Sequence, residues 1–140
     1  MTREVVVDSC VAVKWFVVEP DADKAVRLLD SDTSLFAPDF VLLEVANALW
    51  KNQRLGRLTS DHADRCLAEA PRYFDQLLPT PEFLEEALTL ARAIDHPVYD
   101  CLYVVASRRR DAPLVTSDDT LVRKLAGVAD AKRIVPLSTY

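Results

Sequence analysis

Near its start the chain carries Val5-Val6-Val7-Asp8-Ser9-Cys10-Val11-Ala12-Val13, a segment that combines two structural signals. The three valines predict a buried strand over residues 5–8, because a continuous β-branched run is typical of strands covered on both faces. Asp8 and Ser9 then predict the start of a helix that runs to about Val17, since short polar side chains cap helix N-termini. A buried strand that leads directly into a helix indicates an α/β fold.

The alternation of strand and helix continues along the rest of the sequence. Thr80-Pro81-Glu82 marks one helix start clearly, because a capping residue, a proline and an early acid follow one another. Strands separated by helices predict a single compact α/β domain over residues 1–140, with a short parallel central sheet flanked by helices. The further predicted helices cover 21–29, 40–54, a segment capped by Thr59 or Ser60, 80–95, 98–110 and 118–125, and the further strands cover 35–37, 73–78, 114–116 and 133–135.

Length, composition and charge restrict the class of protein. A chain of 140 residues, 50% of them hydrophobic, suits one domain and is too short for two. We find no apolar run that fits a signal-peptide core or a membrane span, so we expect a cytoplasmic protein without a membrane partner. The three cysteines, Cys10, Cys66 and Cys101, are expected to be free thiols in or near the core. A net charge of −5 argues against a general polyanion binder, so any nucleic-acid role needs bound metal ions or local basic clusters.

Four acidic residues stand at unusual positions. Asp8 and Asp118 each follow a predicted strand, at the carboxyl edge where ligands of parallel sheets gather. Asp100 opens a helix whose residues 101–105 are nearly all apolar, and Glu44 lies inside a helix among apolar neighbours. Helix capping explains each aspartate taken singly, and a solvated or salt-bridged acid explains Glu44. Four carboxylates on one rim would repel one another, however, so a cluster implies bound cations, and oxygen ligands favour Mg²⁺ or Mn²⁺.

Four segments together resemble the motifs of a known family. In order along the chain they are Val5-Val6-Val7-Asp8-Ser9-Cys10-Val11-Ala12-Val13-Lys14-Trp15-Phe16, the 38–49 segment with Glu44-Val45-Ala46-Asn47-Ala48-Leu49, Tyr99-Asp100-Cys101-Leu102-Tyr103-Val104-Val105-Ala106, and Ala112-Pro113-Leu114-Val115-Thr116-Ser117-Asp118. This order and spacing resembles PIN-domain nucleases and, more narrowly, VapC-type toxins of toxin–antitoxin pairs. Two departures leave the acids untouched: Cys10 replaces a commonly small residue, and Asp111 stands where glycine often precedes the fourth strand.

The resemblance implies a PIN-like fold, metal-dependent endonuclease activity on RNA, a cognate antitoxin and a homodimer. Carried over by position, Asp8, Glu44, Asp100 and Asp118 form an acidic quartet that holds Mg²⁺ or Mn²⁺. We expect water, activated by one or two ions, to attack the phosphate, leaving 5′-phosphate and 3′-hydroxyl ends. Glu44 is expected to complete the site or to orient that water.

Other candidates around the quartet have competing structural interpretations. Cap and turn roles explain Ser9 and Thr116 nearly as well. The helix dipole explains Lys51, Arg54 and the run Arg108-Arg109-Arg110. Trp15, Phe16, Trp50 and Tyr103 are expected in the core rather than at substrate. The supporting or substrate-contacting candidates are Ser9, Thr116, Asn47, Asp119, Lys51 and Arg54.

Two other functions remain open from the sequence. The first is a phosphohydrolase acting on small phosphate esters, but the aspartyl-phosphate type requires D-x-D, and Cys10 occupies the second position. The second is a non-catalytic RNA- or protein-binding module, which would be attractive only if one of the four acids were missing. The two histidines, His62 and His96, appear isolated and show no sign of forming an acid–base pair.

Overall fold

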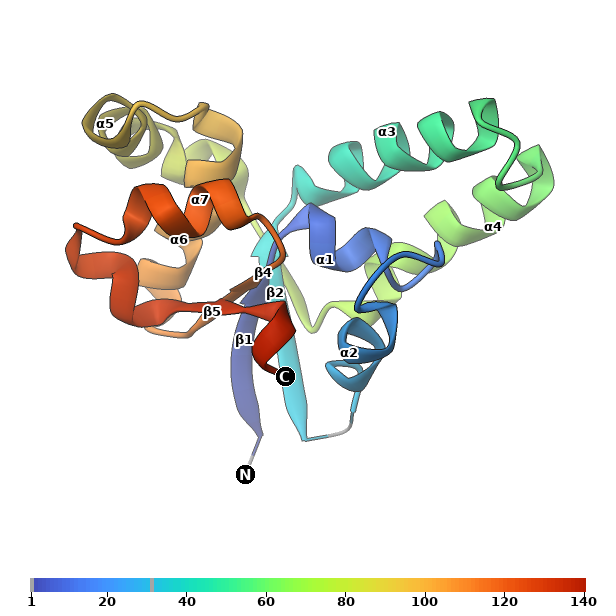
Figure 1. Cartoon of the computed structure of the whole chain (residues 1–140), viewed down its shortest axis with the longest axis horizontal. Helices are drawn as coiled ribbons and strands as arrows, with labels where there is room; N and C mark the ends of the chain where they lie inside the picture. The colour runs from blue at the N-terminus through green and yellow to red at the C-terminus, as the bar shows by residue number, and fades with distance from the viewer. Residues whose placement is uncertain (1, 31) are drawn as a thin grey trace.

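The computed structural model describes residues 2–30 and 32–140 and builds one five-stranded sheet (Figure 1). The spatial order is β3-β2-β1-β4-β5, and every neighbouring pair is parallel. The predicted α/β class with a short parallel sheet is therefore confirmed. The strands are β1 (Arg3–Val7), β2 (Thr33–Pro38), β3 (Gln76–Leu78), β4 (Leu114–Thr116) and β5 (Ile134–Pro136).

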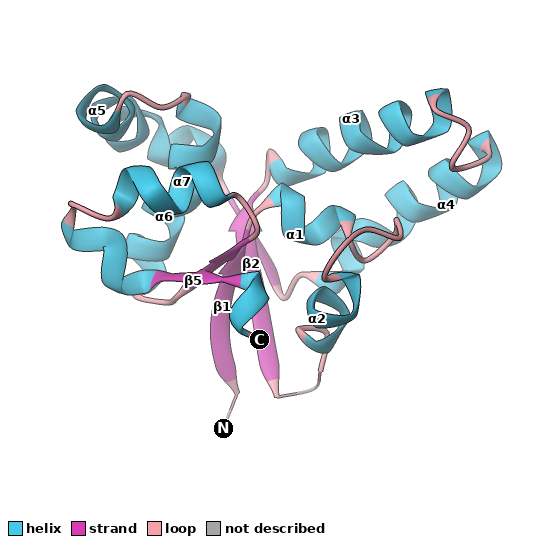
Figure 2. Cartoon of the chain, viewed as in Figure 1, coloured by secondary structure: helices cyan, strands magenta, loops and turns pink. Residues whose placement is uncertain are grey.

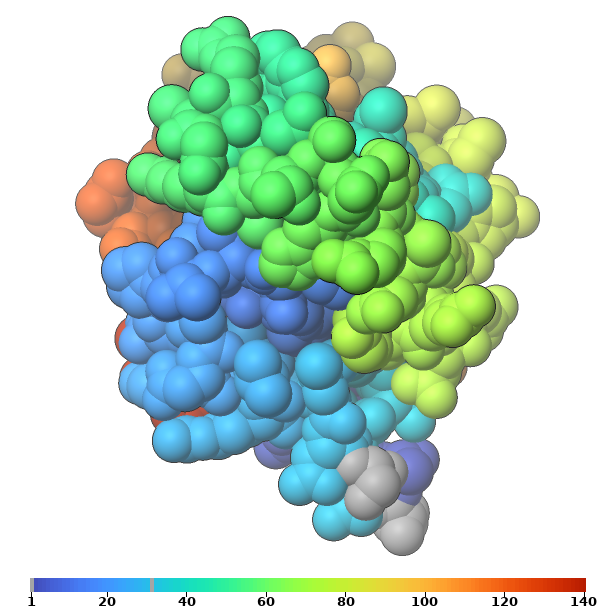
Figure 3. Space-filling view, turned by 90° about the vertical axis from the view of Figure 1, so that its right-hand side faces the viewer, coloured from blue at the N-terminus to red at the C-terminus, as the bar shows by residue number. Residues whose placement is uncertain are grey.

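Helices flank the sheet on both sides. Figure 2 shows α1 to α4 to the right of the strands and α5 to α7 to the left, and Figure 3 shows α3 and α4 above the α1–α2 region. The α-helices are α1 (Ser9–Val13), α2 (Ala22–Arg27), α3 (Val41–Arg54), α4 (Ser60–Glu69), α5 (Leu84–Ile94), α6 (Val98–Arg110) and α7 (Asp119–Leu125). Short 3₁₀ helices cover η1 (Ala70–Tyr73), η2 (Thr80–Phe83), η3 (Ala129–Arg133) and η4 (Leu137–Thr139).

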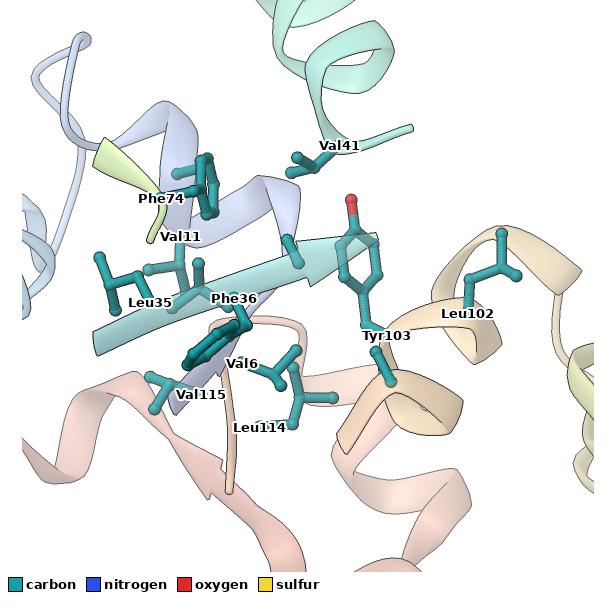
Figure 4. Close-up of a cluster of buried hydrophobic side chains, with 14 of the residues drawn as sticks. Val6, Val11, Leu35, Phe36, Val41, Phe74, Leu102, Tyr103, Leu114 and Val115 are labelled. Atoms are coloured by element: carbon teal, nitrogen blue, oxygen red, sulfur yellow. The ribbon is translucent and has the colours of Figure 1, made fainter. Parts of the chain in front are cut away.

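The core is centred on β1 and on α6, which packs beside it. Val5, Val6 and Val7 are fully buried because β1 lies between β2 and β4 and is covered by helices. Residues 101–107 of α6 are all buried as well, so this helix is apolar on almost every side. Figure 4 shows Tyr103 rising from α6 toward the start of α3, near Val41. The polar end of a core tyrosine thus reaches the carboxyl edge of the sheet.

The strand order creates a switch point at that edge. From β1 the chain first builds β2 and β3 on one side and later adds β4 and β5 on the other side. Val6 and Val7 pair with Leu114 and Val115, so Asp8 and Thr116 leave the sheet side by side. Ligands of open α/β sheets bind at such a point, where helices diverge from the carboxyl ends of adjacent strands.

Two predicted elements are shorter than expected. Helix α1 ends at Val13 rather than near Val17, because the backbone N–H groups of residues 14–16 donate to the carbonyls three residues before them, the pattern of a 3₁₀ turn. Within this turn the Trp15 indole donates a hydrogen bond to Ala25 O, and its ring packs edge-on against Tyr73. The predicted strand over 73–78 is wrong at its start, since Tyr73 still belongs to the 3₁₀ helix η1 (Ala70–Tyr73) and only Gln76–Leu78 pairs with β2. In both cases the chain forms 3₁₀ turns, which local hydrophobic periodicity does not reveal.

Side-chain burial corrects one further expectation and supports another. Trp50 was predicted in the core but is 52% exposed, because it lies one residue, about a quarter turn, past Leu49 on the buried face of α3. Cys66 and Cys101 are buried, Cys10 is half-buried and all three are free, as predicted. No helix in the described part of the chain is both long and apolar enough to cross a membrane.

Candidate active site

Asp8 is the most deeply buried acid of the site. It caps α1: its Oδ1 accepts hydrogen bonds from Val11 N (3.1 Å) and from Cys10 Sγ (2.8 Å), while Oδ2 accepts one from the Thr116 hydroxyl. Its exposure is only 3%, and burial raises the pKa of Asp8 to about 6, against the lowering effect of those hydrogen bonds. The carboxylate is therefore held firmly but is poorly solvated as an anion.

Thr116 joins the ends of the two central strands. Its hydroxyl donates to Asp8, and its oxygen accepts the backbone N–H of Asp118 at 3.0 Å. Asp118 in turn caps α7, with Oδ1 accepting from Leu121 N at 3.1 Å. Both aspartates are thus helix caps in this structure, and both point out from the same switch point, so capping and site formation are not alternatives here.

Asp100 enters the same place from α6. Carboxylate oxygens of Asp100 and Asp118 and a ring nitrogen of His96 all lie within 4.8 Å of one another. Burial raises the pKa of Asp100, and the nearby Asp118 charge adds to this rise, whereas the hydrogen bond between Asp100 Oδ2 and His96 Nε2 (2.6 Å) opposes it. The Asp100 charge also contributes to the raised pKa of Asp8. The three aspartates therefore form one electrostatically coupled group, which we call the acidic centre.

Glu44 stands beside the acidic centre rather than within its tightest group. It projects from the first turn of α3, and its Oε1 accepts a hydrogen bond from Tyr103 Oη at 2.6 Å. Burial raises the pKa of Tyr103, and the charges of Glu44 and Asp8 add to the effect, so the phenol stays protonated and acts as a donor. Tyr103 therefore connects Glu44 with the core of the site.

An open groove of about 650 Å³ extends from Glu44 along α3. Lys14 and Lys51 lie on its walls, and the exposed apolar side chains of Leu43 and Tyr99 stand at the same groove. Ser9 and Asn47 also line it. The groove therefore combines basic, polar and apolar groups directly next to a carboxylate.

Several candidates lie away from this arrangement. Arg54 does not line the groove; its guanidinium lies over the exposed Trp50 ring, 5.2 Å from the ring centroid. Asp119 is exposed, one residue beyond the cap of α7. The arginine run at the end of α6 is engaged in ion pairs with Asp130, Glu86 and Glu4. The sequence interpretation assigned these arginines to the helix dipole; the structure adds ion pairs with acids from other parts of the chain.

Sequence reasoning missed His96 and undervalued Tyr103. His96 was described as isolated, yet its Nε2 contacts Asp100, and only 7% of its side chain is exposed. Helical spacing gives no signal for it, because His96 precedes Pro97, the N-cap of α6, and therefore lies outside the helix that carries Asp100. Tyr103 lies one turn after Asp100 and was taken only as a core residue, although a buried phenol needs a hydrogen-bond partner.

The chemistry of these side chains fits a divalent cation. Three carboxylates come together without a lysine or arginine partner in the described part of the chain, and burial raises the pKa of two of them. Such an arrangement disfavours the ionised form until a positive charge arrives. Oxygen donors at this spacing suit Mg²⁺ or Mn²⁺, with Asp8, Asp100 and Asp118 as the side chains that would hold the ion.

Solved structures show the same fold. A crystal structure of PAE2754 from Pyrobaculum aerophilum superimposes with a TM-score of 0.72 at 27% identity, covering 99% of this chain and 94% of that chain. A toxin–antitoxin complex from Klebsiella pneumoniae matches with a TM-score of 0.61 over 95% of this chain and 97% of that chain, and its 11% identity supports the fold alone.

Sequence comparisons assign the family. Ribonuclease VapC3 from Pyrobaculum aerophilum is 32% identical over 123 residues, which cover 86% of this chain and 94% of that protein. Exonuclease VapC9 from the same organism is 33% identical over 94 residues, 67% of this chain and 69% of its own length. The model of the PIN domain matches residues 5–127, a range that contains all four acids of the sequence motifs. The chain therefore belongs to the PIN-domain family and, within it, to the VapC group.

Proposed function

We propose that the protein is a divalent-metal-dependent endoribonuclease and the toxin of a toxin–antitoxin pair. The observation that carries this proposal is the convergence of Asp8, Asp100 and Asp118 at the switch point of the sheet, where no arginine or lysine of the described chain pairs with them. The relatives that are named ribonuclease and exonuclease support nuclease chemistry. An acidic centre of this kind suits phosphodiester hydrolysis, because the substrate is an anion that needs cationic stabilisation.

Each residue of the site has a proposed role that follows from its position. Asp8, Asp100 and Asp118 hold Mg²⁺ or Mn²⁺, and Thr116 fixes the spacing between the first and the last of them. When bound, such an ion lowers the pKa of water and stabilises negative charge on the phosphate. Glu44, held by Tyr103, orients the attacking water by accepting a hydrogen bond from it. The expected products carry 5′-phosphate and 3′-hydroxyl ends.

The groove beside Glu44 is the proposed path of the RNA strand. Lys51 provides positive charge for backbone phosphates, and Asn47 offers amide hydrogen bonds along the same helix face, whereas Lys14 is paired with Glu19 of the same groove at 3.3 Å. Tyr99, with 64% of its surface exposed, presents a ring on which an unpaired base stacks. Since the groove is open, a continuous strand enters without a free end, which favours internal cleavage.

Partner proteins are proposed from the exposed apolar surface. Leu43, Trp50 and Leu55 on or after α3 are 71%, 52% and 62% exposed, more apolar surface than a helix facing only water normally carries. We assign this surface to a cognate antitoxin, which would block the groove, and to a homodimer contact. An antitoxin with a basic side chain near Glu44 would complement the local charge.

The experiment that tests the function uses circular and linear RNA of identical sequence. Purified protein with Mg²⁺ or Mn²⁺ is expected to linearise the circle, and chelator or the Asp118→Asn substitution is expected to stop the reaction. Digestion of linear RNA alone would indicate an exonuclease, which contradicts the proposal of internal cleavage. Equal cleavage by wild type and Asp118→Asn would identify a contaminating nuclease.

The same preparation distinguishes the other functions considered. Turnover of a small phosphate ester without RNA cleavage would contradict the proposal in favour of a phosphohydrolase. RNA binding without cleavage in either metal would indicate a non-catalytic module. Growth arrest on expression, relieved by a small protein encoded beside the gene, is the expected result for a toxin.

A further inference from the structure

His96 lies at the acidic centre, and no step of the proposed reaction uses it. Its Nε2 is 2.6 Å from Asp100 Oδ2, and a ring nitrogen lies within 4.8 Å of carboxylate oxygens of both Asp100 and Asp118. Within residues 2–30 and 32–140, these three side chains form the single group of potential metal ligands that approach one another this closely. Its composition is therefore two oxygens and one nitrogen, not oxygen alone.

The fold fixes the position of the ring before any ion arrives. Asp95 ends α5 in the left-handed region (φ 53°), and the His96 N–H donates to Ala91 O at 3.2 Å. Pro97 follows directly and sets the start of α6, while the Lys124 amino group donates to the carbonyl of Asp95. The loop is thus attached to α5, α6 and α7 at once, and the imidazole has little freedom to move.

The surroundings of the ring do not explain its presence as a stabilising feature. Only 7% of the side chain is exposed, and Nδ1 is buried without a hydrogen-bond partner among the described residues. A buried polar atom without a partner costs about 1–3 kcal/mol, so packing alone would favour an apolar residue here. The contact of Nε2 with Asp100, close to Asp118, places the ring at the acidic centre, and the unpartnered Nδ1 leaves that ring without a second hydrogen bond that would explain it as a packing residue.

We propose that His96 Nε2, in the tautomer that carries its proton on Nδ1, is a ligand of the ion at the acidic centre, beside Asp100 and Asp118, and that this nitrogen makes the centre prefer Mn²⁺ to Mg²⁺. This inference rests on the proposed function, because it concerns the same ion. Mg²⁺ takes oxygen ligands almost exclusively, whereas imidazole nitrogen suits first-row transition metals. Mn²⁺ accepts both carboxylate oxygen and imidazole nitrogen, so it satisfies the mixed set of donors.

The test is pulsed electron paramagnetic resonance of the Mn²⁺-loaded, tag-free protein. We expect nitrogen modulation from a coordinated imidazole in the wild type and its loss in His96→Gln. Glutamine keeps an N–H donor for Asp100, so a role limited to that hydrogen bond would survive the substitution. The chain has only two histidines, and His62 lies on α4 at a different pocket, so His62→Gln is the matched control that keeps the modulation.

A second readout measures metal preference directly. The ratio of the Mg²⁺ and Mn²⁺ dissociation constants, from calorimetric titration, is expected to fall about tenfold in His96→Gln, mainly through weaker Mn²⁺ binding. Thermal unfolding of each variant shows whether it is folded. If His96→Gln does not fold, modulation that persists in His62→Gln still assigns the signal to His96, because no third histidine exists.

The outcomes separate this inference from the proposed function. Mn²⁺ that binds without nitrogen modulation in the wild type overturns the role of His96 and leaves the nuclease proposal in place. An unchanged ratio of dissociation constants in a folded His96→Gln variant overturns the claimed preference. A wild-type protein that binds Mg²⁺ but no Mn²⁺ overturns this inference alone, and one that binds neither ion contradicts both proposals.

Discussion

The charged side chains at the two ends of α6 have different kinds of partner. At its C-terminal end three consecutive arginines each meet an acid, and the best of these contacts joins Arg108 to Asp130 through two hydrogen bonds of 2.8 and 2.6 Å. At its N-terminal end Asp100 meets Asp118 and His96 instead. The three pairs at the C-terminal end are Arg108–Asp130, Arg109–Glu86 and Arg110–Glu4.

This contrast separates acids that are compensated by a basic side chain of the fold from acids whose charge an external cation would compensate. A buried carboxylate with a guanidinium partner is compensated within the chain, as Asp130 is. In the described chain the acidic centre has no such partner, and burial raises the pKa of Asp8 and Asp100. Because helices can place arginines next to acids, as α6 does, the lack of one at the acidic centre is the feature that points to an external cation.

The largest expected effect comes from removing one charge of the acidic centre. Asp118→Asn keeps the helix cap, since asparagine caps as well as aspartate, but it removes an ion ligand. We expect RNA cleavage to fall by at least about 10²-fold, because even residues that only support metal ligands cost 10–100-fold. Single-turnover cleavage of a defined RNA measures this effect.

Asp130→Asn is the matched substitution at the other end of α6. It removes the carboxylate that accepts both Arg108 hydrogen bonds and leaves only the longer contact with Glu86 (3.9 Å), so we expect the free energy of unfolding to fall by about 1–3 kcal/mol. RNA cleavage by the folded variant should be unchanged. Equal losses of cleavage in Asp118→Asn and Asp130→Asn would abolish the distinction between the two groups of acids.

The second effect concerns stability without metal. The pKa of Asp8 is about 6 in the folded protein and 3.8 ordinarily, so the fold binds this proton more tightly than the unfolded chain does. The stabilising contribution of Asp8 is therefore complete below about pH 4 and is lost as the pH rises through about 6. The asparagine of Asp8→Asn does not titrate. In the presence of chelator at neutral pH, the free energy of unfolding of this variant should therefore be about 1–3 kcal/mol higher than that of the wild type.

Urea unfolding of both proteins across this pH range tests the prediction. The difference between Asp8→Asn and wild type should be small near pH 4, grow up to about pH 6 and then remain constant. Added Mg²⁺ or Mn²⁺ should reduce the difference, since only the wild type gains from the ion. A wild type more stable than the variant in chelator at neutral pH would argue against an uncompensated charge at Asp8.

A smaller effect is expected from Tyr103→Phe. The substitution removes the hydroxyl that donates to Glu44 Oε1 and keeps the buried ring. We expect about a tenfold slower cleavage, in line with the loss of a supporting hydrogen bond at a metal site. The cleavage rate at saturating RNA measures this effect. An unchanged rate would contradict the proposed role of Tyr103 in holding Glu44.

The smallest effect is expected from Arg109→Gln. The Arg109–Glu86 pair is solvent-exposed, and such pairs contribute about 0–1 kcal/mol. Thermal unfolding and RNA affinity should both change little. A marked loss of RNA affinity at constant stability would show instead that the arginine run contacts the substrate, which would reverse its structural assignment.

Much of the fold was predictable because its signals are local. The valine run before Asp8 and the cap at Thr59 follow from backbone preferences, and the structure has both where expected. The early end of α1 was not predictable, because local periodicity reveals neither the 3₁₀ hydrogen bonds of residues 14–16 nor the contacts that Trp15 makes with Ala25 and Tyr73. Those contacts exist only after the chain has folded.

The acidic centre was predictable in its members and less so in its geometry. Asp8 and Asp118 follow strands, and parallel strands bring such positions to one edge. The inclusion of His96 and the separate attachment of Glu44 through Tyr103 depend on how α6 packs, which spacing alone does not reveal. The buried hydroxyl of Thr116, a candidate from sequence, proves to bridge the two strand ends.

The most direct test of the account is a calorimetric titration of Mn²⁺ into the wild type, Asp8→Asn and Asp130→Asn. The account predicts saturable binding in the wild type, equal binding in Asp130→Asn and none in Asp8→Asn. Binding that is equally strong in Asp8→Asn, or absent from the wild type, would contradict the claim that the unpaired acids form an ion site.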